Sequence, residues 1–305
     1  MPKHRVKMIL NPNADLGRAW RQAADLRPVV EQYGGADWTG TVYPTHAIEL
    51  ARQAAEEGYE LIISVGGDGT VHEVINGIMQ VPVENRPRIG IVPLGSGNDF
   101  AHAVGIDPRP AYALQNVFTG KSRRIDIGRL EDGSGRVEYW DNALGIGFDA
   151  TVTIRSRKFT YMSGFMIYFL AVLQTILLNH DAPRMHITTD NETWTDELLM
   201  LVLANGSREG GGFLVAPQAQ PDDGVHDYVC IQHVSRPMML RLIPEVMRGT
   251  HGRFRQVRMG KLTRMELNSE APLTIHVDGE IFAGFGMDVR QLKVELLPGA
   301  VEIIT

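Results

Sequence analysis

The sequence feature that most constrains the fold is a glycine-rich run placed directly after a strand pattern of the fully buried kind. Residues 61–65 (LIISV) are short, apolar and rich in β-branched side chains, and residues 66–69 read Gly-Gly-Asp-Gly. A similar arrangement recurs where residues 88–93 (RIGIVP) lead into a Gly-Ser-Gly run at 95–97. Because ligands of parallel sheets bind beyond the carboxyl ends of the strands, both loops are predicted to line one binding edge.

The first 120 residues alternate between strand and helix patterns. Strands are predicted at 6–10, 38–43, 61–65 and 88–93, and helices at 18–33, 46–57 and from the first glycine loop to about 79. This alternation indicates right-handed crossovers and a parallel sheet packed against helices. We predict an N-terminal αβα nucleotide-binding domain over residues 1–125, within a fold of the α/β plus mainly β class.

The pattern changes near residue 121, where alternation at period two begins. Strands are predicted at 124–129, 137–143, 184–189, 198–204, 225–231, 273–277 and 292–296, and helices at 159–179 and 236–249. Such alternation is typical of antiparallel sheets with one face on the core. We predict a C-terminal, β-sandwich-like accessory domain over residues 126–305, which agrees with a length of about two domains.

Composition narrows the function. The net charge is −6, which argues against a nucleic-acid partner because such proteins are usually basic. The single cysteine, Cys230, excludes an internal disulfide and a multi-cysteine metal cluster, fits a reducing cytoplasm, and is expected to be packed in a strand. No two histidines stand at His-x-x-x-His spacing, so no zinc site is predicted.

The first glycine loop has the chemistry of a phosphate site. Without Cβ atoms its backbone N–H groups can approach an anion closely, and the N-terminus of the following helix adds positive potential. Thr70 is predicted to cap that helix, with Glu73 completing a capping box. Asp68 in a phosphate cradle is costly unless it meets Mg²⁺, so a nucleotide–magnesium site is predicted. The structural alternative is a tight strand-to-helix turn.

The second loop, residues 93–100 (PLGSGNDF), also follows a strand and opens a helix. Ser96 or the loop backbone can hold phosphate oxygens, and Asp99 can orient an acceptor hydroxyl or support a metal. Helix capping is the structural alternative for Asn98 and Asp99. The Walker and protein-kinase motifs are absent from the sequence, as is a dinucleotide-binding motif after the first strand.

These loops, GGDGT at 66–70 and PLGSGNDFA at 93–101, resemble the diacylglycerol kinase catalytic-domain family. That family includes sphingosine and ceramide kinases and soluble bacterial lipid kinases. The resemblance covers nearly the whole chain, and the order of its motifs is more specific than any one of them. The further motifs are Asn-Pro at 11–12, TVYPTHA at 41–47, VHEVING at 71–77, GIGFDA at 145–150, NGSREGGG at 205–212, the run at 216–224, and Val-Asp-Gly-Glu at 277–280.

The resemblance implies phosphoryl transfer from ATP to a lipid hydroxyl, with diacylglycerol as the first expectation. It gives Glu280 the role of the base that removes the hydroxyl proton, Asp68 the binding of Mg²⁺, and Asp99 the support of metal or acceptor. From pattern alone, Glu280 simply follows an Asp-Gly hairpin turn. The residues expected to bind the nucleotide are Asn11, Thr41, Gly66, Gly67, Asp68, Gly69, Thr70, Gly95 and Ser96.

The resemblance also implies a second, structural Mg²⁺ held by Asp223 and by carbonyl groups near Gln220 and Val225. The alternative is a polar surface turn, which the Pro-Asp-Asp-Gly sequence explains by itself. Two positions depart from the family pattern, because Asp15 and Thr45 stand where the family commonly has glycine. The departure at Asp15 puts the first phosphate contact in doubt, and the departure at Thr45 puts the backbone freedom at that position in doubt.

Membrane contact is expected from the distribution of charge. Residues 248–264 carry six basic residues and no acidic one: Arg248, Arg253, Arg255, Arg258, Lys261 and Arg264. Arg155, Arg157 and Lys158 precede an uncharged segment at 159–180. These features are expected to dock the accessory domain on lipid as a peripheral contact at the inner membrane face. A solvated basic face is the alternative, and membrane insertion of residues 159–179 is a second one.

Two other functions remain open at this point. One is a kinase of a soluble acceptor, because phosphofructokinases and NAD kinases share the Gly-Gly-Asp-Gly element. The other is a nucleotide-sensing protein without turnover, against which the joint presence of Asp68, Asp99 and Glu280 argues. The expected partner is a lipid substrate, no nucleic acid is expected, and a homodimer is left open.

Overall fold

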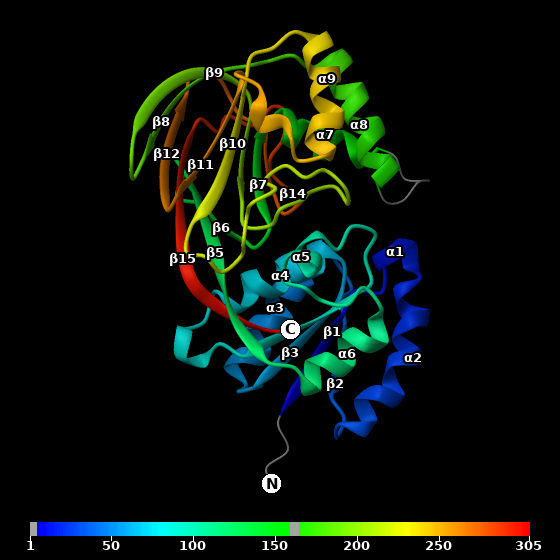
Figure 1. Ribbon diagram of the computed structural model, residues 1–305. Helices are drawn as coiled ribbons and strands as arrows, with labels where there is room; N and C mark the ends of the chain where they lie inside the picture. The colour runs from blue at the N-terminus through cyan, green and yellow to red at the C-terminus, as the bar shows by residue number, and fades with distance from the viewer. Residues whose placement is uncertain (1–4, 159–164) are drawn as a thin grey trace. The chain divides into compact units, whose positions relative to one another are not determined.

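The computed structural model describes residues 5–158 and 165–305 (Figure 1). The chain divides into two compact units, one formed by residues up to 127 together with 299–305, and one formed by 128–298. The chain passes between the units in β5 (Ser122–Asp132) and in β15 (Gln291–Ile304). The boundary predicted from sequence lies close to this division, but no sequence pattern indicated that the last seven residues return to the N-terminal unit.

The N-terminal unit is built on a parallel sheet with the strand order β2-β1-β3-β4. The strands are β1 (Val6–Leu10), β2 (Asp37–Gly40), β3 (Leu61–Gly66) and β4 (Arg88–Pro93), and the end of β15 pairs with β4 at Ile303 and Ile89. The predicted parallel sheet is thus confirmed. The strand β2 lies on one side of β1, and β3 lies on its other side. The strand order therefore reverses between β1 and β3, and parallel sheets bind their ligands at such a point.

Helices cover both faces of this sheet (Figure 1). They are α1 (Ala14–Gly17), α2 (Ala19–Gln32), α3 (His46–Glu56), α4 (Asp68–Ile78), α5 (Asp99–Ala103) and α6 (Pro110–Thr119), with a 3-10 turn at Val83–Asn85. Ile63 and Val65 of β3 pack in one cluster with Leu26 of α2 and Leu114 of α6. Their neighbour Ile62 is also fully buried, as expected for a strand with both faces covered.

The C-terminal unit is mainly antiparallel β-structure, which confirms the predicted accessory fold. Its strands are β6 (Val137–Trp140), β7 (Ala143–Gly147), β8 (Arg184–Thr189), β9 (Thr193–Ala204), β10 (His226–Gln232), β11 (Val257–Leu262), β12 (Arg264–Ser269), β13 (Ile275–Val277) and β14 (Glu280–Ala283), with parts of β5 and β15. Its helices are α7 (Phe148–Ser156), α8 (Phe165–Leu178) and α9 (Arg236–Met247), with a 3-10 turn at His251–Arg253.

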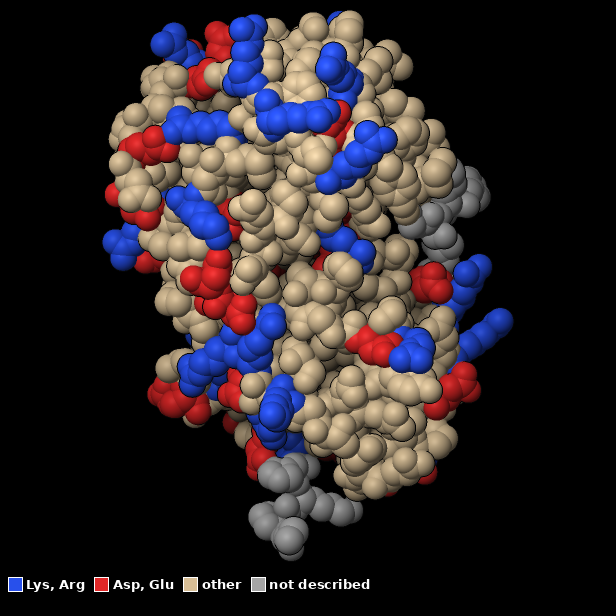
Figure 2. All heavy atoms as spheres, viewed as in Figure 1, with Lys and Arg blue, Asp and Glu red and all other residues tan. Residues whose placement is uncertain are grey.

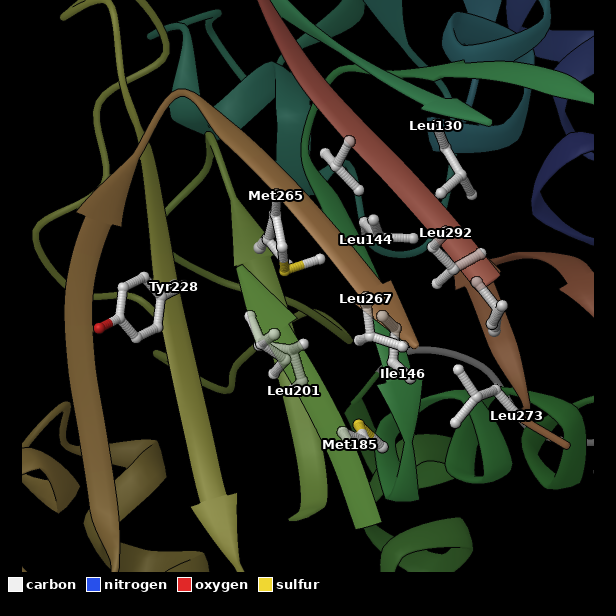
Figure 3. Packing of buried hydrophobic residues seen from close by; sticks show 14 of the residues in the cluster. Leu130, Leu144, Ile146, Met185, Leu201, Tyr228, Met265, Leu267, Leu273 and Leu292 are labelled. Atoms are coloured by element: carbon white, nitrogen blue, oxygen red, sulfur yellow. The ribbon is translucent and has the colours of Figure 1, made fainter. Parts of the chain in front are cut away.

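The strand β9 separates two hydrophobic clusters of this unit. Leu201 and Leu203 belong to the hydrophobic cluster that the strands of this unit form among themselves, and Figure 3 shows part of this cluster. Met200 and Val202 point the other way, into the cluster that the helices α8 and α9 cover. Because successive residues of a strand face opposite sides, β9 is apolar at every position from 198 to 204 rather than at every second one.

The structure corrects several element boundaries and adds helices. The strand predicted at 137–143 is interrupted at residues 141 and 142, whose N–H groups donate to the Asp278 carboxylate. The helices α6 and α7 were not predicted. Among the described residues, no helix has the length and apolar character that a membrane span requires. Residues 159–164 of the predicted 159–179 helix lie outside the described part of the chain.

A buried histidine predicts a specific pH dependence of stability. His226 is fully buried, stacks on Trp140, and lies 2.6 Å (Nδ1) from Asn205 Oδ1. Burial lowers the pKa of His226 to about 3 from an ordinary 6.5. Below pH 6.5 the unfolded chain therefore binds a proton that the folded chain excludes, so acidification towards pH 3 removes stability.

We expect this group to lower the free energy of unfolding by up to about 1.4 kcal/mol for each pH unit in that window. Replacement of His226 by Gln, which keeps a donor for Asn205, is expected to flatten the dependence. Urea unfolding at several pH values between 7 and 4 measures it. Parallel curves for the wild type and His226→Gln would contradict the assignment.

Candidate functional site

The predicted nucleotide-binding residues lie at the carboxyl ends of the parallel strands. Asn11 follows β1, and its N–H donates to Val65 O at 3.0 Å. Thr41 follows β2, and its N–H donates to Leu10 O at 2.8 Å. The Leu94 N–H donates to Gly66 O at 2.7 Å, which joins the end of β4 to the end of β3. The strand ends therefore form one connected edge at the point where strand order reverses.

The two glycine loops touch each other, as the sequence predicted for neighbouring parallel strands. A Cβ atom placed on Gly67 would lie 3.0 Å from Gly95 Cα, and one placed on Gly95 would clash with Gly67 Cα. Only glycine allows this approach of the two backbones. Asn98 holds the second loop closed, because its side chain accepts the Gly95 N–H at 3.0 Å and donates to Gly95 O at 2.8 Å.

Asp68 and Asp99 approach the same residue of the second loop. A Cβ atom on Gly97 would lie 3.0 Å from Asp68 Oδ2 and 3.6 Å from Asp99 Oδ2. The other oxygen of Asp68 accepts the Phe100 N–H at 3.2 Å. The two residues begin α4 and α5, where a helix N-terminus favours negative charge. Two carboxylates with hard oxygen atoms around one small space suit Mg²⁺, so the residues present fit this ion.

The predicted capping box at Thr70 and Glu73 is wrong. The helix α4 begins at Asp68, with Gly67 as its N-cap, so Thr70 lies inside the first turn. The Thr70 hydroxyl oxygen instead lies 3.3 Å from the Asn11 Nδ2 donor. The Glu73 carboxylate accepts the N–H groups of Thr45 and Ala47 at 2.9 and 3.0 Å. It thus caps the N-terminus of the neighbouring helix α3 rather than of its own.

The two departures from the family pattern both adopt the left-handed backbone conformation. The φ angle is 49° at Asp15 and 71° at Thr45. Glycine enters this region freely, and aspartate tolerates it better than most residues, whereas a β-branched residue is strained there. The preference for glycine thus has a backbone reason at both positions, and the strain is concentrated at Thr45.

Replacement of Thr45 by Gly is expected to stabilise the protein by about 0.5–1 kcal/mol, because relief of the left-handed strain exceeds the added entropy of the unfolded chain. The Thr45 side chain is exposed, and its contact with Glu73 uses the backbone N–H, which glycine keeps. Chemical denaturation measures the change. As a matched control, Thr193→Gly in the extended strand β9 is expected to destabilise. A loss of stability in Thr45→Gly would contradict the strain.

Glu280 lies at the start of β14, directly after a two-residue turn. Asp278 and Gly279 have φ angles of 50° and 83°, as in a type I′ hairpin turn, and Val277 pairs with Glu280. The Asp278 carboxylate accepts the N–H groups of residues 141, 142 and 143 at 3.0, 2.9 and 2.9 Å. Asp278 therefore anchors the turn that presents Glu280, a role that sequence analysis missed.

Arg157 forms an ion pair with Glu280. Its Nη2 lies 2.6 Å from Glu280 Oε2 and donates to Gly279 O at 3.0 Å. The Glu280 side chain stays 46% exposed, so the carboxylate is held yet open to solvent. The sequence places Arg157 in the basic cluster that is expected to contact the membrane, whereas the structure shows it bonded to the hairpin. Arg155, two residues earlier, bonds to Asn179. No local pattern could have indicated a pair 123 residues apart.

His276 supports the same hairpin from the buried side. Its Nδ1 accepts the Gly279 N–H at 3.2 Å, and its Nε2 lies 2.6 Å from Asp149 Oδ2 in the first turn of α7. Glu209 lies close enough for the three side chains to resemble a metal site. However, because Nδ1 accepts a hydrogen bond, the proton of the neutral ring is on Nε2, which then donates to Asp149. We therefore interpret this cluster as a hydrogen-bonded support for the hairpin.

The predicted second metal site has a competing partner. The Asp223 Oδ2 atom lies 2.7 Å from Lys261 Nζ, and its Oδ1 accepts the Val225 N–H at 3.3 Å. Hydrogen bonding to Asp223 raises the pKa of Lys261, so this ammonium group stays charged. The carboxylate and carbonyl oxygens suit Mg²⁺ chemically, but an ion bound through Asp223 Oδ2 would compete with Lys261 for that oxygen. The metal role of these residues stays a prediction.

The basic stretch at 248–264 is largely paired with carboxylates. The ion pairs are Arg253 with Glu245, Arg258 with Glu192, Lys261 with Asp223 and Asp227, and Arg264 with Glu295. The sequence shows no acidic residue within this stretch because the partners come from elsewhere: Glu245 from α9, Asp227 from β10, Glu295 from β15, and Glu192 and Asp223 from loops. The charge available for a membrane is therefore smaller than the sequence suggests.

A pocket of about 220 Å³ lies at the open end of the Glu280 hairpin, within the C-terminal unit. Phe148 and Thr151 of α7 line one side, and Leu273 and Thr274 precede β13 on another. Met287 follows β14 and is 44% exposed. The lining is mainly apolar with a few polar groups, as in sites for small or amphipathic ligands.

Comparison with known proteins follows the same division of the chain. Residues 5–130 match the model of the diacylglycerol kinase catalytic domain, and residues 142–305 match the model of the YegS C-terminal NAD kinase beta sandwich-like domain. A diacylglycerol kinase of Bacillus subtilis (strain 168) is 29% identical over 90% of this chain and 89% of its own. A YegS-like lipid kinase of Chromohalobacter salexigens is 33% identical over 83% of this chain and 78% of its own.

Solved structures agree on the fold. A crystal structure of a diacylglycerol kinase from Bacillus anthracis str. Sterne has a TM-score of 0.72 at 20% identity, covering 100% of this chain and 97% of that chain. Another structure from this strain has a TM-score of 0.79 at 22% identity, over 100% of this chain and 98% of that one. At this identity the likeness concerns the fold alone.

Proposed function

Because the chain belongs to the diacylglycerol kinase catalytic-domain family and is therefore a phosphotransferase of the lipid kinase type, we propose that it transfers the γ-phosphate of ATP to the hydroxyl of diacylglycerol. The observation that carries the proposal is the meeting of two glycine loops and two carboxylates at the ends of β3 and β4, next to the point where the sheet order reverses. The name of the Bacillus subtilis relative supports diacylglycerol as the acceptor.

The N-terminal unit supplies the positioning that phosphoryl transfer needs. The backbone N–H groups of the two loops and the N-terminus of α4 attract the phosphates. Asp68 and Asp99 are the residues that would hold Mg²⁺, which supplies charge neutralisation on the terminal phosphates when it is bound. Asn98 keeps the second loop in the closed form by its two hydrogen bonds to Gly95.

The C-terminal unit supplies the proposed base. The Glu280 carboxylate accepts the proton of the acceptor hydroxyl, for which it must come within about 2.6–3.2 Å of that oxygen. Arg157 holds the carboxylate in place through the ion pair, and the Asp278 and His276 contacts fix the turn that carries it. The half-exposed position leaves Glu280 accessible to an acceptor.

The acceptor is tested by incubating the protein with radiolabelled ATP, Mg²⁺ and one candidate at a time. The lipid candidates are diacylglycerol, monoacylglycerol, ceramide, sphingosine and phosphatidylglycerol, and the soluble ones are NAD and a sugar. We expect labelled phosphatidate from diacylglycerol and the highest kcat/KM for that lipid. Label transferred only to NAD or to the sugar would replace the proposal by a soluble-acceptor kinase, and ATP binding without any transfer would favour a nucleotide sensor.

A further inference from the structure

The outer surface formed by α8 and α9 exposes large apolar side chains. On α8, Leu177 and Leu178 are 70% and 60% exposed. On α9, Leu240 and Met247 are 50% and 38% exposed, and they lie seven residues apart, on one side of the helix. Several exposed apolar side chains on two packed helices indicate an interaction site more strongly than single exposed residues do. We call this surface the α8–α9 face; its residues are Leu177, Leu178, Leu240, Met247, Arg236, Arg241 and Arg248.

The opposite sides of both helices are already used for packing. Ala171 and Ile176 of α8 and Met239 and Leu242 of α9 are buried in the cluster over β9 and β10. The Arg236 Nε donates to Ile176 O at 3.0 Å, which joins the start of α9 to the end of α8. The two helices thus form one layer on the sheet, and the α8–α9 face is the side of that layer turned away from the core.

The charges on the α8–α9 face have one sign. The segment 165–180 has no charged residue and is followed by one exposed acid, Asp181, while residues 235–256 contain five arginines and one acidic residue, Glu245, in a chain with a net charge of −6. Glu245 is 8% exposed and pairs with Arg253, so it does not contribute a negative charge to the face. In Figure 2, basic side chains stand out at the upper end of the C-terminal unit, where Figure 1 places α9.

We propose that the α8–α9 face docks on an anionic bilayer surface. Its leucine and methionine side chains enter the interface, and Arg236, Arg241 and Arg248 lie at the lipid headgroups, as in interfacial amphipathic helices. The proposed docking is peripheral, because α8 has 14 residues within the described part of the chain and is about 21 Å long there, against a hydrocarbon core of about 30 Å. The proposal rests on the proposed function only in that a kinase of a membrane lipid must reach the bilayer.

The combination of features favours a bilayer over a protein partner. A protein interface usually has charge-depleted apolar surface at its centre and mixed polar groups at its rim. Here the exposed apolar side chains of α9, Leu240 and Met247, each stand next to an exposed arginine, Arg241 and Arg248, and residues 235–256 expose no acidic side chain. Each basic residue near an anionic surface raises the partition coefficient about fivefold, which corresponds to about 1 kcal/mol.

The test is sedimentation with vesicles in the absence of ATP. Vesicles of phosphatidylcholine alone are compared with vesicles of phosphatidylcholine and phosphatidylglycerol, at low and high salt. The variants are Arg241→Glu/Arg248→Glu and Leu178→Ser. The matched controls are Arg18→Glu/Arg21→Glu, which makes the same charge change at two exposed positions, the N-cap and the first turn of α2, and Val83→Ser, whose side chain is 61% exposed in the N-terminal unit.

We expect the wild type to bind the anionic vesicles, weakly at high salt, and to bind neutral vesicles at least about tenfold less. Binding to anionic vesicles is expected to fall at least about tenfold in Arg241→Glu/Arg248→Glu and a few-fold in Leu178→Ser, with the controls within about twofold of the wild type. Equal binding by variants and controls, or wild-type binding that ignores both charge and salt, would overturn the proposal.

Two further measurements separate this proposal from the proposed function. Activity on a dissolved short-chain diacylglycerol should be unchanged in the α8–α9 variants. If the wild type has that activity but ignores vesicles, the docking surface is wrong and the function stands. If the wild type binds vesicles through this face but phosphorylates no lipid, the function is wrong and the surface stands. A dimer in light scattering that Arg241→Glu/Arg248→Glu dissociates, without an effect on vesicles, would assign the face to a second copy instead.

Discussion

The Glu280→Gln variant is expected to lower kcat by about 10²–10⁴-fold while ATP still binds with its wild-type affinity. Glutamine has the shape of glutamate but cannot take up a proton at neutral pH, so only the proton transfer is lost. The turn that carries residue 280 is held by Asp278 and His276, and neither contact involves the Glu280 side chain. The hairpin is therefore expected to keep its position in the variant.

Phosphatidate formation with saturating ATP measures the loss, and a fluorescent nucleotide measures ATP affinity. The ion pair with Arg157 is lost as well, but it is half exposed, so the melting temperature should change little. Glu270→Gln is the matched control, because Glu270 is 61% exposed in the same unit and also lies near an arginine, Arg184. A kcat for Glu280→Gln within twofold of the wild type would remove Glu280 from the role of base.

The Asp68→Asn variant is expected to lower kcat by about 10²–10³-fold and to raise the Mg²⁺ concentration needed for half-maximal rate. The asparagine oxygen can still accept the Phe100 N–H, so the loop contact is kept while the negative charge is lost. The loss of one charged group that stabilises transferring phosphates has this order of effect. Asp99 alone then faces Gly97 as a carboxylate.

Initial rates over a series of Mg²⁺ concentrations, with calorimetry of Mg²⁺–ATP binding, measure both effects. Asp25→Asn serves as the control, because Asp25 is an exposed residue of α2 in the same unit. An unchanged Mg²⁺ dependence in Asp68→Asn would show that Asp68 is only a helix N-terminal residue. That alternative has a physical basis, because an acidic residue in the first turn of α4 is favourable without any metal.

The fold was predictable from sequence where the pattern is local. Residues 61–65 alone indicate a strand buried on both faces, and the structure places them at the centre of a parallel sheet. The glycine loops were placed side by side for the same reason, because consecutive parallel strands end at one edge. The strand predicted at 137–143 was wrong at residues 141 and 142, whose hydrogen-bond acceptor, Asp278, lies far along the chain.

The candidate site shows the same limit. The spacing of Thr70 and Glu73 fits the sequence rule for a capping box. In the structure the Glu73 carboxylate instead accepts two N–H groups at the start of α3, and no residue close to Glu73 in the sequence indicates these donors. The basic stretch at 248–264 contains no acidic residue, so its ion pairs could not be predicted from sequence. They form in the folded chain, where Arg258 of β11 pairs with Glu192 and Arg264 of β12 pairs with Glu295. The ion pair between Arg157 and Glu280 was likewise invisible in the sequence, because the two residues are far apart along the chain.

The sequence by itself determined the strand order along the chain, the glycine loops and the identity of the carboxylates, because periodicity, backbone freedom and side-chain chemistry are properties of neighbouring residues. Only the tertiary structure decided which charges are neutralised, which helix Glu73 caps, and that α8 and α9 share an outer face with arginines and leucines. Those outcomes depend on residues tens to more than a hundred positions apart, whose interaction energies exist only after the chain has folded.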